Sequence, residues 1–173
     1  GKKNETTDIE RVFHINDFDK LPDKTFDQII NWIKDGISSG FSMTMVLHGP
    51  PGTGKTQLGR SIFNFMKTPY LEVSEIQDFK KLDLTKHRGI LVDDVDFEPL
   101  SRGIRLNVLD SRASKTVDVK YGSVTTEAFI PRIVTTNNIN AVHGGLKELE
   151  RRIKVIFIPE QISSKFDLQI NIQ

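Results

Sequence analysis

Residues 49–56 have the types and the spacing of a phosphate-binding loop: they read GPPGTGKT and fit the pattern G-x-x-x-x-G-K-[ST]. Glycines in such a loop let successive backbone N–H groups turn toward one anion, and the helix that follows adds its positive dipole end. Lys55 is long enough to reach the β- and γ-phosphates of a nucleoside triphosphate, and the Thr56 hydroxyl can ligate Mg²⁺. The residues expected to line the phosphates are Gly49, Pro50, Pro51, Gly52, Thr53, Gly54, Lys55, Thr56 and Gln57.

A pair of carboxylates, Asp93 and Asp94, follows the apolar run at residues 89–92. Ligands gather at the carboxyl edge of a parallel sheet. A magnesium–triphosphate site needs one carboxylate near the metal and a second to orient or deprotonate the attacking water. We assign Asp93 to the metal and Asp94 to the water; the alternative is a solvated acidic turn. Asp96 is a rival for Asp94, and we expect it in a loop.

Further polar residues stand at the ends of the later apolar runs. Asn137 ends the run at 132–136, where its amide could hold the water or the γ-phosphate, although an Asn at a strand end is often a turn former and Asn138 is a rival. Arg151 and Arg152 precede the last apolar run. Ring-type triphosphatases take a cation for the γ-phosphate from a neighbouring subunit, and this pair fits that role and a surface ion-pair site equally well.

The periodicity of the chain predicts the elements that must position these residues. Apolar residues at helical spacing between Pro22 and Gly40 predict a helix, and short apolar runs predict strands that alternate with helices. From Thr116 the period changes to two, which predicts a β-hairpin with its turn at Gly122–Ser123. The remaining strands are expected at 43–48, 70–73, 89–94, 132–137 and 153–158, and the remaining helices at 55–66, 76–82, 98–110 and 146–151. Such alternation predicts an α/β fold with a parallel sheet covered on both faces, into which the hairpin is inserted.

Lys115, Lys120 and Tyr121 lie on or near the expected hairpin. A hairpin tip that bears lysine and an aromatic ring can reach a phosphodiester backbone. Lysines also protect solvated hairpin edges from pairing with other strands, and by itself the pattern favours that structural role.

Composition narrows the classes of protein. The chain has 173 residues, of which 37% are hydrophobic and 27% charged, and these values favour one globular domain. The net charge of +1 means that any nucleic-acid contact must come from a local basic cluster. The absence of cysteine excludes disulfides, and no apolar run approaches the length of a membrane span. Trp32 fits core packing or a subunit contact, and the histidines, which are His14, His48, His87 and His143, lack metal-binding spacing.

Taken in order, the motifs GPPGTGKT, ILVDD, KTVDVKYGSVTTEAFIP, RIVTTNN and ERRIKVIFIP resemble the superfamily 3 helicase domain. They are most similar to the domain of the Rep initiators of small circular single-stranded DNA viruses, of circovirus and nanovirus type, and of their plasmid relatives. The resemblance covers about residues 43 to 159. It implies an AAA+-type P-loop NTPase fold with a five-stranded parallel sheet, an inserted β-hairpin and a short helical segment in front.

The resemblance also implies roles for single residues. Lys55 and Thr56 match the Walker A motif and Asp93 and Asp94 the Walker B motif. Lys120 falls where the family's hairpin lysine contacts single-stranded DNA, Asn137 matches the polar sensor, and Arg151 or Arg152 matches the arginine finger. ATP and Mg²⁺ are the implied cofactors. The implied segments are a partial oligomerisation segment at 1–40, the helicase ATPase domain at 41–160 and a C-terminal tail at 161–173.

The expected partners are single-stranded DNA and further copies of the chain, which form a hexamer in the full-length protein, whereas this chain alone is compatible with a monomer. No membrane partner is expected. The expected location is the host nucleus for a eukaryotic virus and the cytoplasm for a bacterial plasmid. Three alternatives remain: an ATP-driven switch or helicase loader that does not unwind, an RNA-virus helicase-like ATPase, and, more weakly, a small-molecule kinase, for which we find no arginine-rich lid.

Overall fold

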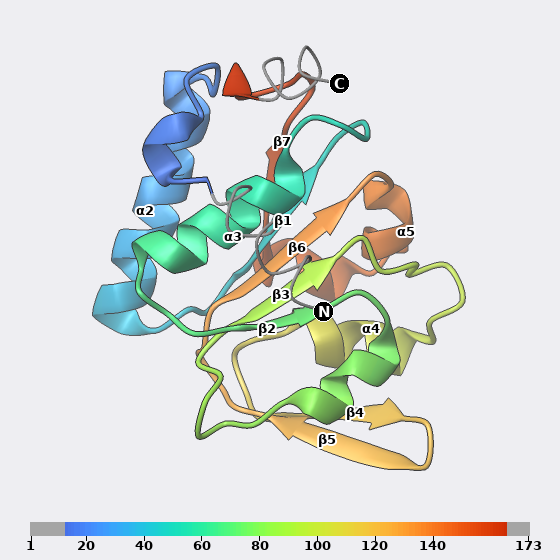
Figure 1. The fold of residues 1–173 in the computed structure, drawn as a ribbon. Coiled ribbons are helices and arrows are strands. Elements are labelled where there is room, and N and C mark those ends of the chain that lie inside the picture. Colours follow the sequence, from blue (N-terminus) through green and yellow to red (C-terminus); the bar gives the residue numbers. More distant parts are fainter. Residues whose placement is uncertain (1–12, 166–173) are drawn as a thin grey trace, which may run out of the picture.

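A five-stranded parallel sheet forms the centre of the molecule (Figure 1). The computed structural model describes residues 13–165. The strands lie in the order β2-β3-β6-β1-β7. Their bounds are β1 (Thr44–His48), β2 (Leu71–Val73), β3 (Ile90–Asp93), β6 (Arg132–Thr136) and β7 (Ile153–Phe157). The central strands β1 and β6 are buried along nearly their whole length because helices cover both faces of a parallel sheet.

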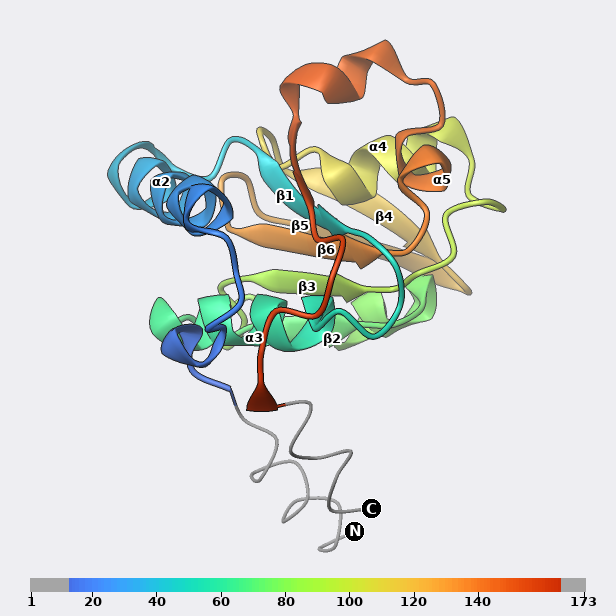
Figure 2. The same cartoon turned by 90° about the horizontal axis from the view of Figure 1, so that it is seen from above.

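Helices form a layer on each side of this sheet (Figure 2). On one face, α2 (Asp23–Ser39) and α3 (Lys55–Phe65) share a buried apolar cluster with the sheet. On the other face, α4 (Arg102–Leu109) and α5 (Ile139–His143) belong to a second cluster. Short 3-10 segments are η1 (Ile15–Asp17), η2 (Ile76–Lys81) and η3 (Lys147–Arg151). The expected α/β fold, with its parallel sheet, flanking helices and leading helix, is confirmed.

Strand order brings distant motifs to one edge of the sheet. β6 lies between β1, which leads into the glycine-rich loop, and β3, which carries the carboxylate pair. In the register, Leu47 of β1 and Asp93 of β3 both lie opposite Thr135 of β6. All three strands are parallel, so their carboxyl ends meet there. The residues that follow β1, β3 and β6 therefore share one edge, as the sequence predicts.

The leading helix α2 is anchored to the start of β1 through Trp32. The indole Nε1 of Trp32 donates to the carbonyl oxygen of Met43 at 2.8 Å, and its ring lies 4.8 Å from that of Phe41. Trp32 is buried. Of the two roles that the sequence leaves open for this residue, the structure shows core packing.

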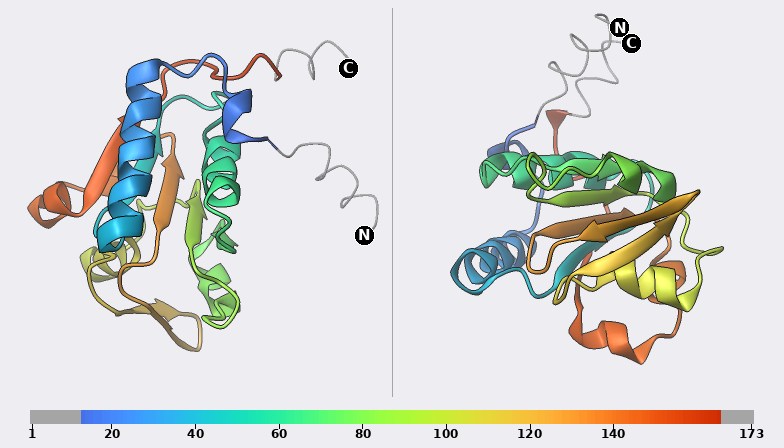
Figure 3. Two further views of the ribbon diagram at one scale, coloured as in Figure 1. Left: turned by 90° about the vertical axis from the view of Figure 1, so that its left-hand side faces the viewer. Right: turned by 90° about the horizontal axis from the view of Figure 1, so that it is seen from below.

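The expected hairpin is present as β4 (Lys115–Val119) and β5 (Gly122–Thr126). It projects from the end of the molecule away from the segment that follows β7 (Figure 3, left). Val117 of β4 is buried in the second apolar cluster. Val119 pairs with Gly122, so the turn consists of Lys120 and Tyr121. The prediction of a turn at Gly122–Ser123 was therefore wrong: Tyr121 adopts the left-handed backbone, with φ of 66°, and Gly122 begins the second strand.

Three expected helices differ in the structure. The helix expected from residue 98 begins at Arg102, because Ser101 caps it: the Ser101 hydroxyl accepts a hydrogen bond from the Ile104 N–H at 3.2 Å. The helices expected at 76–82 and 146–151 are the 3-10 segments η2 and η3. Over residues 13–165, no helix has both the length and the apolar character needed to cross a bilayer.

A buried arginine of the sheet forms hydrogen bonds with both α4 and the hairpin. Arg132, at the start of β6, is 1% exposed. Its guanidinium donates to the carbonyl oxygens of Asn107 and Val108, at 3.0 and 2.8 Å, and to the Thr126 hydroxyl at 2.9 Å. Burial lowers the pKa of Arg132 to about 10, and the charge of Asp110 works in the opposite direction. Arg132 thus caps the carboxyl end of α4 with a positive charge.

Candidate functional site

The loop at residues 49–54 joins β1 to α3, and two of its glycines are required by its shape. A Cβ on Gly49 would lie 1.9 Å from the carbonyl oxygen of Ile158. Gly54 precedes α3 with φ of 103°, a conformation that side chains rarely adopt. The C-terminal segment supports the loop from outside, since the Ile162 N–H donates to the Thr53 carbonyl oxygen at 3.2 Å. The chain therefore turns tightly from β1 into the N-terminus of α3, and Gln57 lies in the first turn of that helix.

Lys55 begins α3, and its side chain folds back into the loop. Its Nζ donates to the carbonyl oxygens of Gly49 and Pro50, at 2.9 and 2.7 Å, and the residue is 7% exposed. Burial lowers the pKa of Lys55, while the negative charges of Asp94 and Asp93 raise it. An anion that enters the loop would replace these carbonyl oxygens as the partner of the ammonium group.

Asp93 receives hydrogen bonds from two threonines. Its Oδ1 accepts from the Thr56 hydroxyl at 2.6 Å and from the Thr135 hydroxyl at 2.7 Å. Thr56 lies in the first turn of α3, directly after the glycine-rich loop. The first acid of the pair therefore contacts the hydroxyl that the sequence expects to share a metal ion with it. Hydroxyl and carboxylate oxygens are donors that suit Mg²⁺, which binds one or two such groups and keeps waters and phosphate oxygens as its other ligands.

The side chain of Asp94 does not follow that of Asp93 toward Thr56. Its backbone has φ of 51°, in the left-handed region, and its N–H donates to both the carbonyl oxygen and the hydroxyl of Thr135, each at 3.1 Å. The side chain is exposed. The structure therefore separates the two acids: Asp93 faces Thr56, and Asp94 faces the solvent beyond the strand.

Asp94 and Asn137 line the same cavity, whose volume is about 250 Å³. Asn137 is exposed at the end of β6. Its rival Asn138 has a structural task, because its Oδ1 accepts from the Ala141 N–H at 3.2 Å and caps α5. Asp96 also lines the cavity and lies in the loop after β3, where its Oδ1 accepts from the Glu98 N–H. Asp94 and Asn137 therefore border one space that solvent can enter.

The two candidate arginines differ in their surroundings. Arg152 is half-buried and forms an ion pair with Asp110 at 2.5 Å. Arg151 is exposed, and its backbone carbonyl accepts a hydrogen bond from the Arg112 guanidinium. Both residues precede β7, and the Arg152 carbonyl accepts from the N–H of Thr44 at the start of β1. They therefore lie at the amino edge of the sheet, opposite the glycine-rich loop.

The hairpin residues also separate into two groups. Lys115 lies at the base of the hairpin, where its Nζ is 3.2 Å from the carboxylate of Asp110. Lys120 and Tyr121 form the tip, and Tyr121 is 92% exposed. Lys120 Nζ lies 5.3 Å from the centroid of the Tyr121 ring. The structure thus brings two of the three candidate DNA-binding residues together and uses the third in an internal ion pair.

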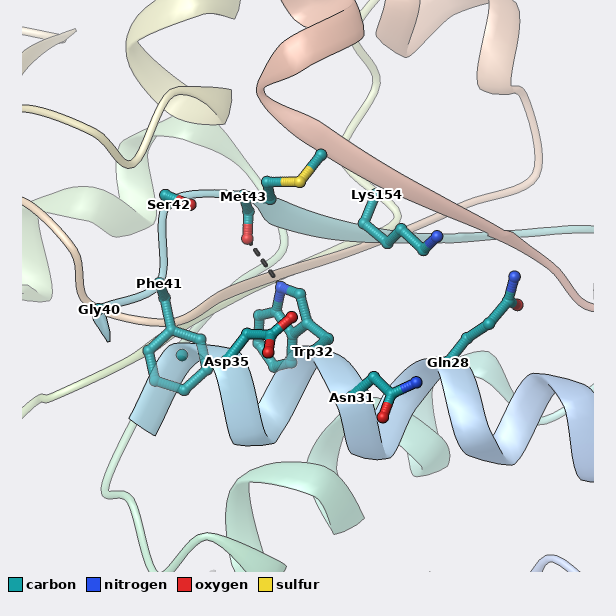
Figure 4. A pocket seen from close by; sticks show the side chains of 10 residues that line it. Gln28, Asn31, Trp32, Asp35, Gly40, Phe41, Ser42, Met43 and Lys154 are labelled. Carbon is teal, nitrogen blue, oxygen red and sulfur yellow. Dashed lines mark hydrogen bonds between the residues drawn. The ribbon is translucent and has the colours of Figure 1, made fainter. Parts of the chain in front are cut away.

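A second cavity, of about 260 Å³, lies between α2 and the amino ends of β1 and β7 (Figure 4). Trp32 and Phe41 form its apolar wall, and Asn31, Asp35 and Lys154 lie around it. Because it opens at the amino edge of the sheet, it is separate from the glycine-rich loop and the carboxylate pair.

Comparisons with known proteins agree with this geometry. A glycine-rich loop before a helix, with an acidic strand end across one intervening strand, defines a P-loop nucleoside triphosphatase. The family described as "ATPase family associated with various cellular activities (AAA)" matches residues 45–160. The chain belongs to this AAA family, which supports a nucleotide-dependent role and ATPase activity. A search of the curated proteins found no significant match.

Among solved structures, the chain is similar to one described as "The A form apo structure of NrS-1 C terminal region-CTR". The TM-score is 0.56 at 17% sequence identity. The match covers 91% of this chain and 41% of that chain, so this protein spans less than half of the length of the other. At this identity, the likeness concerns the fold alone.

Thr135 is a site residue that sequence reasoning missed. It stands in a run of buried β-branched residues, and nothing in the run distinguishes it from a core threonine. Its hydroxyl nevertheless donates to Asp93 and accepts from the N–H of Asp94. The one available signal is its position before Asn137 at the end of a strand.

We expect Thr135→Val to lower ATP turnover about 10- to 100-fold and to raise the Mg²⁺ concentration needed for half-maximal rate, because outer-shell partners orient metal ligands. Steady-state ATPase assays over a magnesium series would measure both effects. Thr135→Ser keeps the hydroxyl and should retain most of the activity. A valine variant with the wild-type rate and magnesium dependence would show that Thr135 contributes only to core packing and that its hydroxyl does not orient Asp93.

Proposed function

We propose that this protein is the ATP-dependent helicase or translocase domain of a Rep-type replication initiator. In this proposal it hydrolyses ATP between neighbouring subunits, moves on single-stranded DNA and unwinds duplex during rolling-circle replication. The observation that carries the proposal is the contact between Thr56 and Asp93, in a unit that also exposes a lysine–tyrosine hairpin tip. The first feature suits cleavage of a triphosphate, and the second suits contact with a polynucleotide strand.

At the nucleotide, each residue has a separate task. Lys55 binds the β- and γ-phosphates in exchange for its present carbonyl partners. Thr56 and Asp93 would hold Mg²⁺, and their oxygen donors fit it; when bound, the ion neutralises charge on the phosphate oxygens. Asp94 orients or deprotonates the attacking water, and Asn137, which lines the same cavity, holds that water or the γ-phosphate.

Arg151 is our candidate for the cation that reaches the γ-phosphate. It lies at the amino edge of the sheet, so it cannot approach the loop of its own subunit. Its exposed side chain is available to a neighbouring copy, whereas the guanidinium of Arg152 is engaged by Asp110. Removing Arg152 would leave a buried carboxylate with one fewer partner. We therefore propose a homo-oligomer, hexameric in the full-length protein, in which Arg151 acts between subunits.

The proposed partner on the hairpin side is single-stranded DNA. Lys120 supplies a charge for a phosphate, and the ring of Tyr121 offers a surface for a base or a sugar. Lys115 supports the base of the hairpin through Asp110. The proposed location follows from the host: the nucleus for a eukaryotic virus and the cytoplasm for a plasmid.

Three assays test this proposal: ATPase activity with and without single-stranded DNA, the same assay with an RNA oligonucleotide, and displacement of one strand of a forked duplex. We expect single-stranded DNA to raise turnover, and we expect Lys120→Ala to remove most of that rise while the rate without DNA stays unchanged. Lys34→Ala, an exposed lysine on α2, is the matched control and should behave as wild type.

The alternatives predict other results. Stimulation by DNA without strand displacement would indicate an ATP-driven switch or helicase loader. Stimulation by RNA alone would indicate an RNA-directed ATPase. Turnover that responds to neither polynucleotide would overturn the proposed function while leaving the assignment to the AAA family intact.

A further inference from the structure

The hairpin tip is supported by another part of the chain. The backbone N–H of Lys120 donates to the side-chain oxygen of Gln77 at 2.6 Å. Gln77 belongs to η2, which follows β2 and contacts both hairpin strands. The two-residue turn therefore packs against η2, which holds it through this hydrogen bond.

This contact brings a second lysine to the exposed tyrosine. Nζ of Lys80, also in η2, lies 5.7 Å from the centroid of the Tyr121 ring, and Nζ of Lys120 lies 5.3 Å from the same centroid. Both distances fall within the range of cation–π attraction. Two ammonium groups from segments about 40 residues apart in the sequence thus share one ring.

Neither charge is neutralised within the described part of the chain. The neighbouring Lys81 pairs with Asp78 at 3.3 Å, but the ion pairs found in residues 13–165 include neither Lys80 nor Lys120. Like charges at one ring repel each other, and an anion placed between them would relieve that repulsion. Lys80, Tyr121 and Lys120 therefore form a small basic surface that suits a polyanion.

The backbone around Lys80 is held in place. Asp78 Oδ2 accepts hydrogen bonds from the N–H groups of Ser74 and Glu75, at 2.9 and 3.1 Å, and closes the start of η2. Phe79, the neighbour of Lys80, is fully buried. These contacts fix the backbone at Lys80. Little backbone conformational entropy is therefore lost when its ammonium group lies at the tip.

We propose that Lys80 is a further DNA-contacting residue: Lys80, Tyr121 and Lys120 bind one stretch of single-stranded DNA, with the two lysines on phosphates and the ring against a base or sugar. This inference rests on the proposed function and assigns to η2 a share in binding the strand.

The test measures the affinity of the protein for a fluorescein-labelled oligothymidine by fluorescence anisotropy, with a slowly hydrolysed ATP analogue present, over a series of salt concentrations. Each lysine that contacts a phosphate contributes about 0.7 to the slope of log affinity against log salt on single strands, which is about fivefold in affinity at 0.1 M salt. We expect Lys80→Gln and Lys120→Gln each to make this negative slope less steep, and to lower the affinity, by about these amounts. Lys81→Gln, the adjacent lysine that is paired with Asp78, is the matched control and should leave the slope unchanged.

The outcomes separate the two proposals. If Lys120→Gln lowers the slope and Lys80→Gln does not, the role of Lys80 is overturned and the proposed function stands. If the Lys80 and Lys81 variants lose affinity equally, the effect comes from general charge, and the role of Lys80 is again overturned. If the wild-type protein does not bind the oligonucleotide in the presence of an ATP analogue, both proposals fail together.

Discussion

Asp94→Asn is expected to stop ATP turnover while nucleotide binding remains largely intact. Asparagine has nearly the same shape but cannot accept a proton from the attacking water, and a positioned general base contributes about 10²–10⁴-fold to a rate. Asp94 is exposed and its hydrogen bonds with Thr135 come from its backbone N–H, so the substitution should not disturb the fold. Binding of a fluorescent ATP analogue, measured beside single-turnover hydrolysis, separates the two effects.

Asp96→Asn is the control for this substitution. Asp96 lines the same cavity and is also exposed, but its carboxylate accepts from the Glu98 N–H in its own loop. We expect this variant to hydrolyse ATP at nearly the wild-type rate. Loss of nucleotide binding in Asp94→Asn, or equal loss of turnover in both variants, would show that the division of roles between Asp93 and Asp94 is wrong.

The second large effect concerns stability: Arg132→Ala should lower the free energy of unfolding by about 3 kcal/mol or more. The substitution leaves a cavity and removes the partners of buried acceptors at Asn107, Val108 and Thr126. Because those acceptors belong to α4 and to the hairpin, loss of the guanidinium should weaken the packing of both elements on the sheet. Urea unfolding followed by circular dichroism would measure it.

Arg112→Ala serves as the comparison. The Arg112 side chain also donates to backbone carbonyls, those of Ser42 and Arg151, but it is exposed, so water can replace it. We expect a loss of about 1 kcal/mol or less. Equal unfolding midpoints for wild type and Arg132→Ala would contradict the structural role of the buried guanidinium.

Much of the nucleotide side of the molecule is predictable from the sequence because local patterns determine it. The glycines and Lys55 form a contiguous motif, and Asp93 ends an apolar run whose parallel pairing places it at the carboxyl edge of the sheet. Thr135 is not predictable in this way, since its role depends on cross-strand register with Asp93. The register becomes visible only when β6 is known to lie between β1 and β3.

The hairpin and the arginines show what depends on tertiary contacts. The preference of turns for glycine predicted the turn at Gly122–Ser123. In the structure the turn consists of Lys120 and Tyr121, and the N–H of Lys120 donates to Gln77. Sequence spacing made Arg151 and Arg152 equivalent, and the buried carboxylate of Asp110 distinguishes them. Lys80 lies about 40 residues from the hairpin tip, and no local pattern links the two.

The most direct measurement is a crystal structure of the Asp94→Asn variant grown with ATP and Mg²⁺, in which slow turnover should preserve the nucleotide. We predict that the β- and γ-phosphates lie within hydrogen-bonding distance of Lys55 Nζ and that the metal binds the Thr56 hydroxyl beside Asp93. A nucleotide bound away from residues 49–56, or a metal distant from both Thr56 and Asp93, would contradict the central claim.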